Sequence, residues 1–307
     1  MTIRAHFESA APGRIERMTA SSTNQNATAP SHGNQAAPPL RAIPGLVEEC
    51  REWELTLGEG PVIAAAVHDG HSMRRSLQPY LAIDAATRRR DEDPLTGLLT
   101  TVGDVQLRVR ASRFEADLNR PRELAISADP ANTWGIRVWD EGLPDSEIDR
   151  SLAYHDRFYT MVRRLMDAAI ARHGQVLVLD IHSYNHRRDG AEAAPADPDD
   201  NPEIDLGVTT LDHDRHGELL ERFSEALRSV PLQGSTPDVR RNVRYDGGGH
   251  FPEWLYATYG QSVCAISLEY KKVFMDEWSG KADIGALYEL RDGLRQAVAA
   301  ARPVLEA

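Results

Sequence analysis

Ionisable side chains stand at the ends of three apolar segments of the chain. His68 follows the first of these segments, with His71 three residues later. His182 and Glu269 lie near the ends of the other two. Histidine nitrogens and carboxylate oxygens are common ligands of catalytic zinc, which takes three protein ligands and keeps one position open. A carboxylate that is not a ligand can take a proton from water at such a centre.

From the residues alone, we expect His68, His182 and one further ligand to hold a metal ion. Glu269 is then the candidate general base. Asp180 lies two residues before His182, and a carboxylate at that spacing suits a group that holds the ring of a ligand histidine.

The elements that position these residues are predicted to be strands. The run 61–67 is continuously apolar, and the strand predicted over 176–181 is apolar up to Asp180, which is typical of central strands buried on both faces. Open α/β sheets place their chemistry at the carboxyl ends of the strands. Other strands are expected within 52–57, 105–110, 125–128, 135–139 and 262–270, and helices over 145–173, 214–229, 252–259 and 284–304.

Composition limits the classes of function. The chain has 307 residues, 41% of them hydrophobic, and a formal net charge of −12, which argues against nucleic-acid and membrane partners. No apolar run approaches the length of a membrane span, and no signal-peptide pattern is present, so we expect a cytoplasmic protein. The two cysteines do not suggest a disulfide framework. We expect residues 1–40 to be a disordered extension, because they are poor in large apolar residues, and 41–307 to be a single metallohydrolase domain.

Four short motifs occur in an order that resembles the zinc carboxypeptidase and aspartoacylase superfamily. Within it, the N-formylglutamate amidohydrolase family is the closest resemblance, over about residues 60 to 280. The motifs are His68-Asp-Gly-His71, Asp117-Leu-Asn-Arg120, Asp180-Ile-His-Ser183 and Ser267-Leu-Glu269, with further similarity at His173-Gly174, Asp205-Leu-Gly207 and Gly248-Gly-His250.

The resemblance implies a fold, a reaction and a cofactor. The fold would be a three-layer α/β/α arrangement around a central mixed sheet, of the zinc-peptidase-like (phosphorylase/hydrolase-like) type. The reaction would be hydrolysis of N-formyl-L-glutamate to L-glutamate and formate. The cofactor would be one divalent metal ion, with zinc as the expected identity.

The second metal ligand is open at this point. The family's usual Pro-His-Ser-Gly is replaced by Val67-His-Asp-Gly, followed by His71. Either His71 or an acidic residue before the next strand, Glu92 or Asp93, would complete the site, and we rank His71 and Asp93 ahead of Glu92. The alternative for the acidic pair is a solvated charge run.

Three further residues match the family's substrate-carboxylate region. Arg113, Asn119 and Arg120 are expected to bind a small anionic N-acyl amino acid, since arginine can hold a carboxylate through two hydrogen bonds. The alternative is a structural pair between Asp117 and Arg120. His250 is a candidate catalytic residue that could polarise the scissile carbonyl, or a loop histidine without a role.

Two other functions share these features. A zinc metallocarboxypeptidase, or a deacylase of other N-acyl amino acids, would use the same site. A binding or regulatory protein on a decayed hydrolase scaffold is a third interpretation, against which the retention of His68, His182 and Glu269 argues. The oligomeric state is open.

Overall fold

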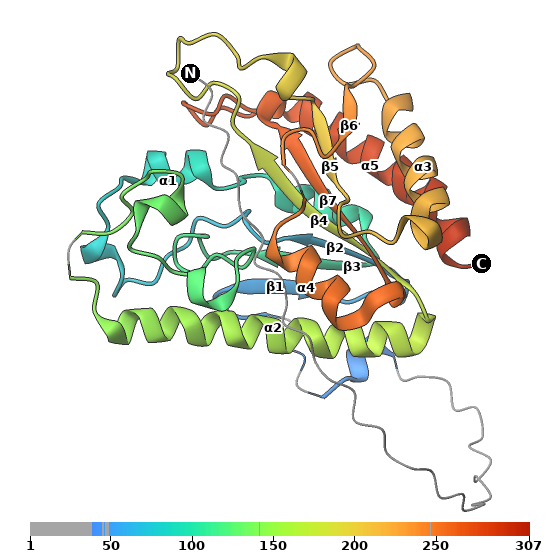
Figure 1. Ribbon diagram of the computed structural model, residues 1–307, viewed down its shortest axis with the longest axis horizontal. Helices are drawn as coiled ribbons and strands as arrows, with labels where there is room; N and C mark the ends of the chain where they lie inside the picture. Colours follow the sequence, from blue (N-terminus) through green and yellow to red (C-terminus); the bar gives the residue numbers. More distant parts are fainter. Residues whose placement is uncertain (1–38, 45, 47–48, 141, 246) are drawn as a thin grey trace, which may run out of the picture. The chain divides into compact units, whose positions relative to one another are not determined.

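Seven strands form one mixed sheet with helices on both of its faces (Figure 1). A computed structural model describes residues 39–44, 46, 49–140, 142–245 and 247–307. The strand order is β1-β3-β2-β4-β7-β5-β6. The expected three-layer α/β/α fold with a mixed sheet is confirmed. The strands are β1 (Trp53–Thr56), β2 (Val62–Ala66), β3 (Val105–Val109), β4 (Val176–Tyr184), β5 (Ile204–Gly207), β6 (Val239–Arg241) and β7 (Val263–Lys271).

The centre of the sheet is parallel and its flanks reverse direction. β3, β2, β4 and β7 run parallel to one another, whereas β1 pairs antiparallel with β3 and β5 pairs antiparallel with β7. Every residue of β2 and β4 is buried, as expected for strands covered on both faces. The carboxyl ends of the four central strands therefore meet at one edge.

Four of the five α-helices that the structure describes cover the two faces of the sheet. In Figure 1, α2 and α4 lie on one side of the sheet and α3 and α5 on the other. Each pair of helices packs into its own apolar cluster with residues from one face of the strands. The helices are α1 (Ala85–Asp91), α2 (Asp145–His173), α3 (His213–Ser229), α4 (His250–Tyr259) and α5 (Ile284–Leu305), and short 3-10 helices lie at 40–42, 78–80, 96–102, 122–124, 130–133, 198–200, 260–262 and 272–274.

Strand alternation decides which face carries the chemistry. In β4, Leu177 and Leu179 pack with the α3 and α5 cluster, whereas Val176 and Val178 pack with the α2 and α4 cluster. Because successive side chains of a strand point to opposite faces, Asp180 and His182 share the α2 and α4 side.

Helix α2 follows the predicted pattern along its whole length. Its apolar residues, including Phe158 and Leu165, are buried against the sheet, and Phe158 alone contributes about 2 kcal/mol of burial. Asp145 lies in the first turn, where a negative charge stabilises a helix. The helix ends at Gly174, whose φ of 75° suits glycine.

The expected strands at 125–128 and 135–139 are wrong. Their apolar residues pack instead into a small separate cluster that includes Val138 and Trp139, and Trp139 forms only an isolated bridge with Leu81. Burial of these side chains without a neighbouring strand explains why the apolar pattern did not produce a hairpin.

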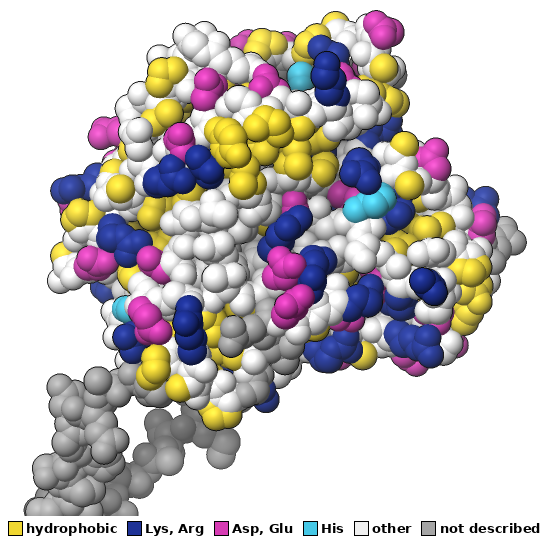
Figure 2. All heavy atoms as spheres, turned by 180° about the vertical axis from the view of Figure 1, so that it is seen from behind, with side chains coloured by type: hydrophobic (Ala, Val, Ile, Leu, Met, Phe, Trp, Pro, Cys, Tyr) yellow, Lys and Arg dark blue, Asp and Glu magenta, His cyan; other side chains and the backbone are white. Residues whose placement is uncertain are grey.

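The remaining expectations concern the whole chain. The predicted disordered extension lies outside the described residues except at its end, where Leu40 is fully buried. The described residues, from 39 to 307, belong to one compact unit. Both cysteines are free. None of the helices that the structure describes is long and apolar enough to cross a membrane. On the face seen in Figure 2, basic and acidic side chains are interspersed.

Candidate metal centre and active site

The ends of three parallel strands bring the sequence-predicted residues together. His182 of β4 and Glu269 of β7 are register partners across the two strands. His68 follows β2, which pairs with β4 on the other side. The edge that the sequence predicted for the site is therefore where these residues lie.

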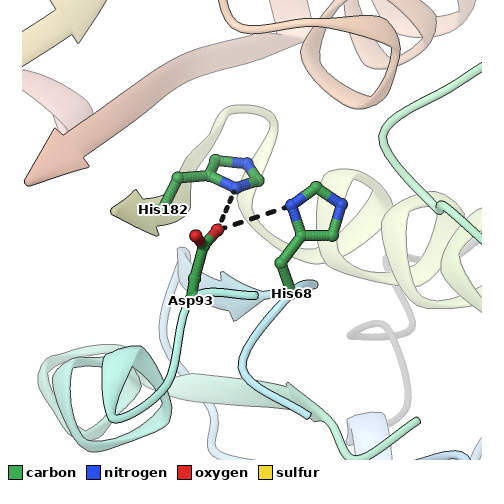
Figure 3. Close-up of side chains that lie close together, drawn as sticks. All are labelled: His68, Asp93 and His182. Carbon is green, nitrogen blue, oxygen red and sulfur yellow. Dashed lines mark hydrogen bonds and ion pairs between the residues drawn. The ribbon is translucent and has the colours of Figure 1, made fainter. Parts of the chain in front are cut away.

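His68, Asp93 and His182 form a buried cluster. Their candidate ligand atoms all lie within 4.8 Å of one another. The Nδ1 atoms of His68 and His182 lie 3.4 and 3.1 Å from Oδ2 of Asp93. In Figure 3 one nitrogen of each ring faces the carboxylate and the other points away. The Nδ1 atoms of the two histidines and Oδ2 of Asp93 thus face one another and could bind the same ion.

The outward nitrogens of both rings meet carboxylates. Nε2 of His68 lies 2.8 Å from Oδ1 of Asp117. Nε2 of His182 lies 3.0 Å from Oδ2 of Asp180, which also accepts a hydrogen bond from Ser267. A carboxylate behind a histidine fixes the ring and its tautomer, and it makes the opposite nitrogen a better ligand.

The cluster fits a divalent metal ion. Nδ1 of His68 is buried and makes no hydrogen bond within the part of the chain that the structure describes. Burial opposes charge on His182, but Asp180 and Asp93 outweigh it and raise its pKa well above the ordinary range. Burial also opposes charge on Asp93, yet the two histidines lower its pKa. The surroundings therefore favour positive charge at this point, and the nitrogen and oxygen donors suit zinc or a similar ion.

A buried lysine holds the segment that carries Asp93. Lys272, 1% exposed, donates through Nζ to the carbonyl oxygens of Arg90 and Glu92 and to Oδ1 of Asn185, at 2.6, 2.8 and 2.9 Å. The backbone N–H of Asp93 donates to the carbonyl oxygen of His68 at 2.9 Å. This acidic segment is therefore buried and held in place, unlike a solvated charge run.

The structure distinguishes the three candidates for the second ligand. Asp93 faces both histidines. His71 and Glu92 face each other, with Nδ1 of His71 2.6 Å from Oε2 of Glu92. Glu92 also accepts a hydrogen bond from Ser112. His71 and Glu92 thus form a pair of their own beside the cluster.

Glu269 lies next to the cluster with an altered acidity. Burial and the charges of Asp93 and Asp180 outweigh the favourable effect of His182 and raise the pKa of Glu269 to about 8. A carboxyl group with a pKa near neutrality can both accept and return a proton.

The predicted substrate-binding arginines are engaged by Asp117. Nε and Nη2 of Arg113 donate to Oδ2 of Asp117 at 3.2 and 2.7 Å, and Nε of Arg120 lies 3.7 Å from the same oxygen. The ring of Trp134 covers both guanidinium groups, at 4.4 and 5.2 Å. Asp117 therefore links His68 to both arginines.

Asn119 connects this region to the glycine-rich turn. Its Nδ2 donates to the carbonyl oxygen of Gly248 at 2.9 Å, and its Oδ1 accepts from the backbone of Phe251 at 2.8 Å. Gly249 has a φ of 85°, and a Cβ there would lie 2.6 Å from Nδ2 of Asn119. Only glycine fits this close approach.

His250 faces a different hollow. It begins α4, and its ring lies 5.6 Å from that of Tyr159. Together with His155 and Trp254 it lines a surface pocket between α2 and α4. The structure does not bring it into the metal cluster, and its proposed catalytic role stays a prediction.

A family model described as N-formylglutamate amidohydrolase matches residues 60–275. The chain belongs to the N-formylglutamate amidohydrolase family. This membership confirms the resemblance found in the sequence. The matched residues include the cluster of His68, Asp93 and His182, as well as Asp117, Asp180 and Glu269.

Solved structures agree with the family assignment at the level of the fold. A crystal structure of N-formylglutamate amidohydrolase from Ralstonia eutropha is 19% identical with a TM-score of 0.61, and the alignment covers 83% of this chain and 100% of that chain. A gene product of Agrobacterium tumefaciens is 17% identical with a TM-score of 0.57, over 84% and 97% of the two chains. No curated protein matches the chain.

Sequence reasoning missed two features of the site. Lys272 follows an apolar strand directly, and a lysine in that position is the signal that was available. Arg244 and Tyr245 precede the glycine run, of which only Gly248-Gly-His250 was singled out from the sequence.

Proposed function

We propose that this protein hydrolyses the amide bond of N-formyl-L-glutamate, or of a closely related N-acyl amino acid, to release the acyl group as formate or its analogue. Membership of the amidohydrolase family supports the reaction class. The observation that carries the proposal is the convergence of His68, Asp93 and His182 beside Glu269.

The proposal assigns His68, Asp93 and His182 to one divalent metal ion, with zinc as the expected identity. Such an ion would supply Lewis acidity, which lowers the pKa of water and polarises an amide carbonyl. Asp117 and Asp180 hold the two rings so that both Nδ1 atoms point inward.

Glu269 moves the proton. It accepts a proton from the attacking water as the water oxygen adds to the acyl carbon. It then delivers that proton to the amine nitrogen as the carbon–nitrogen bond breaks. A pKa of about 8 in this setting suits both directions of transfer near neutral pH.

Other sequence predictions remain predictions. Arg113, Asn119 and Arg120 were assigned to the substrate, but Arg113 and Asn119 already donate hydrogen bonds within the protein, and Arg120 pairs with Asp117. The cytoplasmic location is likewise a prediction.

The test compares formate release from N-formyl-L-glutamate by the wild type, Glu269→Gln and His182→Ala. Glu269→Gln should retain the metal and lose about 10²- to 10⁴-fold in turnover, the usual contribution of a general base. His182→Ala should lose the metal and activity together. Arg222→Met, on the exposed side of α3, is the control that should remain active. Normal turnover by Glu269→Gln would refute the assignment of Glu269 as the base. Preferential cleavage of N-acetyl amino acids or peptides would show that N-formyl-L-glutamate is not the substrate.

A further inference from the structure

A buried carboxylate holds the loop 243–245 next to the proposed base. Asp205 of β5, 1% exposed, accepts backbone N–H groups of Val243, Arg244 and Tyr245 at 3.1, 2.7 and 3.4 Å. β5 pairs antiparallel with β7, and Asp205 is the register partner of Glu269. The loop is therefore anchored to Asp205, the residue of β5 that pairs with the proposed base on the neighbouring strand β7.

Among the residues that the structure describes, Arg244 is a cation without a carboxylate partner. Its guanidinium group lies over the rings of Tyr184 and Tyr245, at 5.8 and 5.2 Å. Its Nε is buried and makes no hydrogen bond, and no carboxylate among the described residues pairs with it. A partly desolvated guanidinium with unused donors is suited to an anion.

The two arginines of the preceding strand, β6, differ from Arg244 because each of them pairs with a carboxylate. Arg240 pairs with Asp238 at 2.6 Å, and Arg241 pairs with Glu221 at 2.7 Å. These two charges are neutralised within the protein. The charge of Arg244 is balanced by no comparable contact in the described part of the chain.

The arginines predicted from the sequence are less available. Three nitrogens of Arg113 already donate, two to Asp117 and one to the carbonyl oxygen of Asp91. Arg120 faces the same Asp117, and Trp134 covers both guanidinium groups. These contacts suit a structural support of Asp117, and through it of His68, better than an open carboxylate site.

The position of Arg244 relative to the reacting groups is also favourable. Tyr184 lies two residues beyond His182 on the same face of β4, so Arg244 packs on the strand end that carries a proposed ligand. Burial and the charge of Glu269 raise the pKa of Tyr245 to about 12, while Arg244 opposes this shift. The charges of both Arg244 and the proposed base therefore act on Tyr245.

We propose that Arg244 binds a carboxylate of the substrate, with Tyr184 and Tyr245 forming the wall against which its guanidinium is held. The ligand class is an amino acid that carries one or two carboxylates, and Asp205 acts as a positioning residue for the loop. This inference rests on the proposed function for the identity of the reaction, but its binding chemistry can be tested separately.

The kinetic test compares Arg244→Met, Arg244→Lys, Arg120→Met and the control Arg222→Met. The substrates are N-formyl-L-glutamate and N-formyl-L-glutamine, which differ only in the charge of the side chain. Arg244→Met should lower kcat/KM about 10- to 100-fold, mainly through KM, as expected for loss of hydrogen bonds to a charged group. Arg244→Lys should recover part of the loss.

Comparison of the two substrates identifies which carboxylate Arg244 binds. A loss confined to N-formyl-L-glutamate assigns Arg244 to the side-chain carboxylate. An equal loss on both substrates assigns it to the α-carboxylate. Unchanged kinetics of Arg244→Met on both, or a comparable loss only in Arg120→Met, would overturn the proposal.

A binding measurement separates this inference from the proposed function. L-Glutamate is titrated calorimetrically into the metal-loaded wild type, Arg244→Lys and Arg244→Met, each checked for the wild-type thermal midpoint. If the wild type does not hydrolyse N-formyl-L-glutamate but binds L-glutamate in an Arg244-dependent manner, the function fails and the site stands. If the wild type is active but both variants bind L-glutamate as tightly as it does, the site fails and the function stands. If the wild type neither hydrolyses the substrate nor binds L-glutamate, both fail.

Discussion

Asp117 contacts both a proposed metal ligand, His68, and a predicted substrate-binding residue, Arg113. One of its oxygens lies 2.8 Å from Nε2 of His68, and the other accepts from Arg113 at 2.7 Å. Burial opposes its charge, but Arg113 and His68 hold its pKa well below the usual range. The sequence placed this residue in a substrate motif, and its contacts instead tie a proposed ligand to the protein.

Replacing Asp117 by asparagine should weaken metal binding. The amide keeps the shape of the side chain but removes the negative charge behind the ring of His68. We expect a loss of about 10- to 100-fold in metal affinity, the usual effect of removing such a partner. The measurement is a competitive titration with a chromophoric chelator. Asp156→Asn is the matched control, because Asp156 pairs with Arg122 on the surface, and equal affinities in the two variants would contradict the role of Asp117.

Glu269 should give the metal-free protein a distinctive dependence on pH. Its pKa of about 8 in the folded state exceeds the ordinary 4.5, so the folded state binds a proton more tightly than the unfolded chain. The contribution of this group to the free energy of unfolding is therefore present at low pH and is lost as pH rises through about 8. The slope is at most about 1.4 kcal/mol per pH unit, the limit for a difference of one bound proton.

Glu269→Gln isolates this effect. Thermal midpoints of the metal-free wild type and variant are compared at several pH values between 5 and 8. The thermal midpoint of the variant should increase relative to that of the wild type as pH rises, since the variant has no carboxylate to ionise at this position. Parallel curves would show that Glu269 titrates normally.

Among the ordered elements, the segment from α1 to Asp93 was the hardest to predict. Residues 88–93 of this segment are all charged, and α1 buries Arg88 rather than an apolar residue. The usual signal for a buried helix, an apolar stripe, is therefore missing. Burial here depends on polar partners from distant parts of the chain, Lys272 above all, and local sequence patterns do not report such contacts.

Lys272→Met tests whether this lysine holds the segment. Methionine keeps the apolar stem but leaves three buried acceptors without their donor. We expect the free energy of unfolding to fall by about 2–4 kcal/mol and metal affinity to fall with it, measured by denaturant unfolding and metal titration. Lys271→Met is the matched control, because Lys271 is the adjacent residue and is partly exposed. If both variants were equally stable, the assigned role of Lys272 would be wrong.

The long elements were predictable because their buried faces require apolar residues at regular spacing, which the sequence shows directly. β4 begins with the apolar run 176–179, and α2 repeats apolar residues at helical spacing up to Gly174. The short strands β5 and β6, at one side of the sheet, have only four and three residues. They form because tertiary contacts provide neighbours, as in the pairing of β5 with β7, so their sequences alone did not indicate them.

At the scale of the whole molecule, the sheet explains why separated motifs act together. The strand order brings β2, β4 and β7 side by side, so residues from the first third, the middle and the last third of the sequence meet at one edge. The sequence predicted this edge, because parallel strands end together. It did not predict the choice of Asp93, which depends on how the segment before η3 (Thr96–Val102) folds back toward His68.

The central claim is that hydrolysis of N-formyl-L-glutamate depends on a metal held by His68, Asp93 and His182. The most direct measurement is formate release by the purified wild type before and after removal of metal with a chelator, and again after addition of Zn²⁺ or another divalent ion. The account predicts activity that disappears with the metal and returns when it is restored, with no recovery in His182→Ala. Full activity in the chelated, metal-free protein would contradict it.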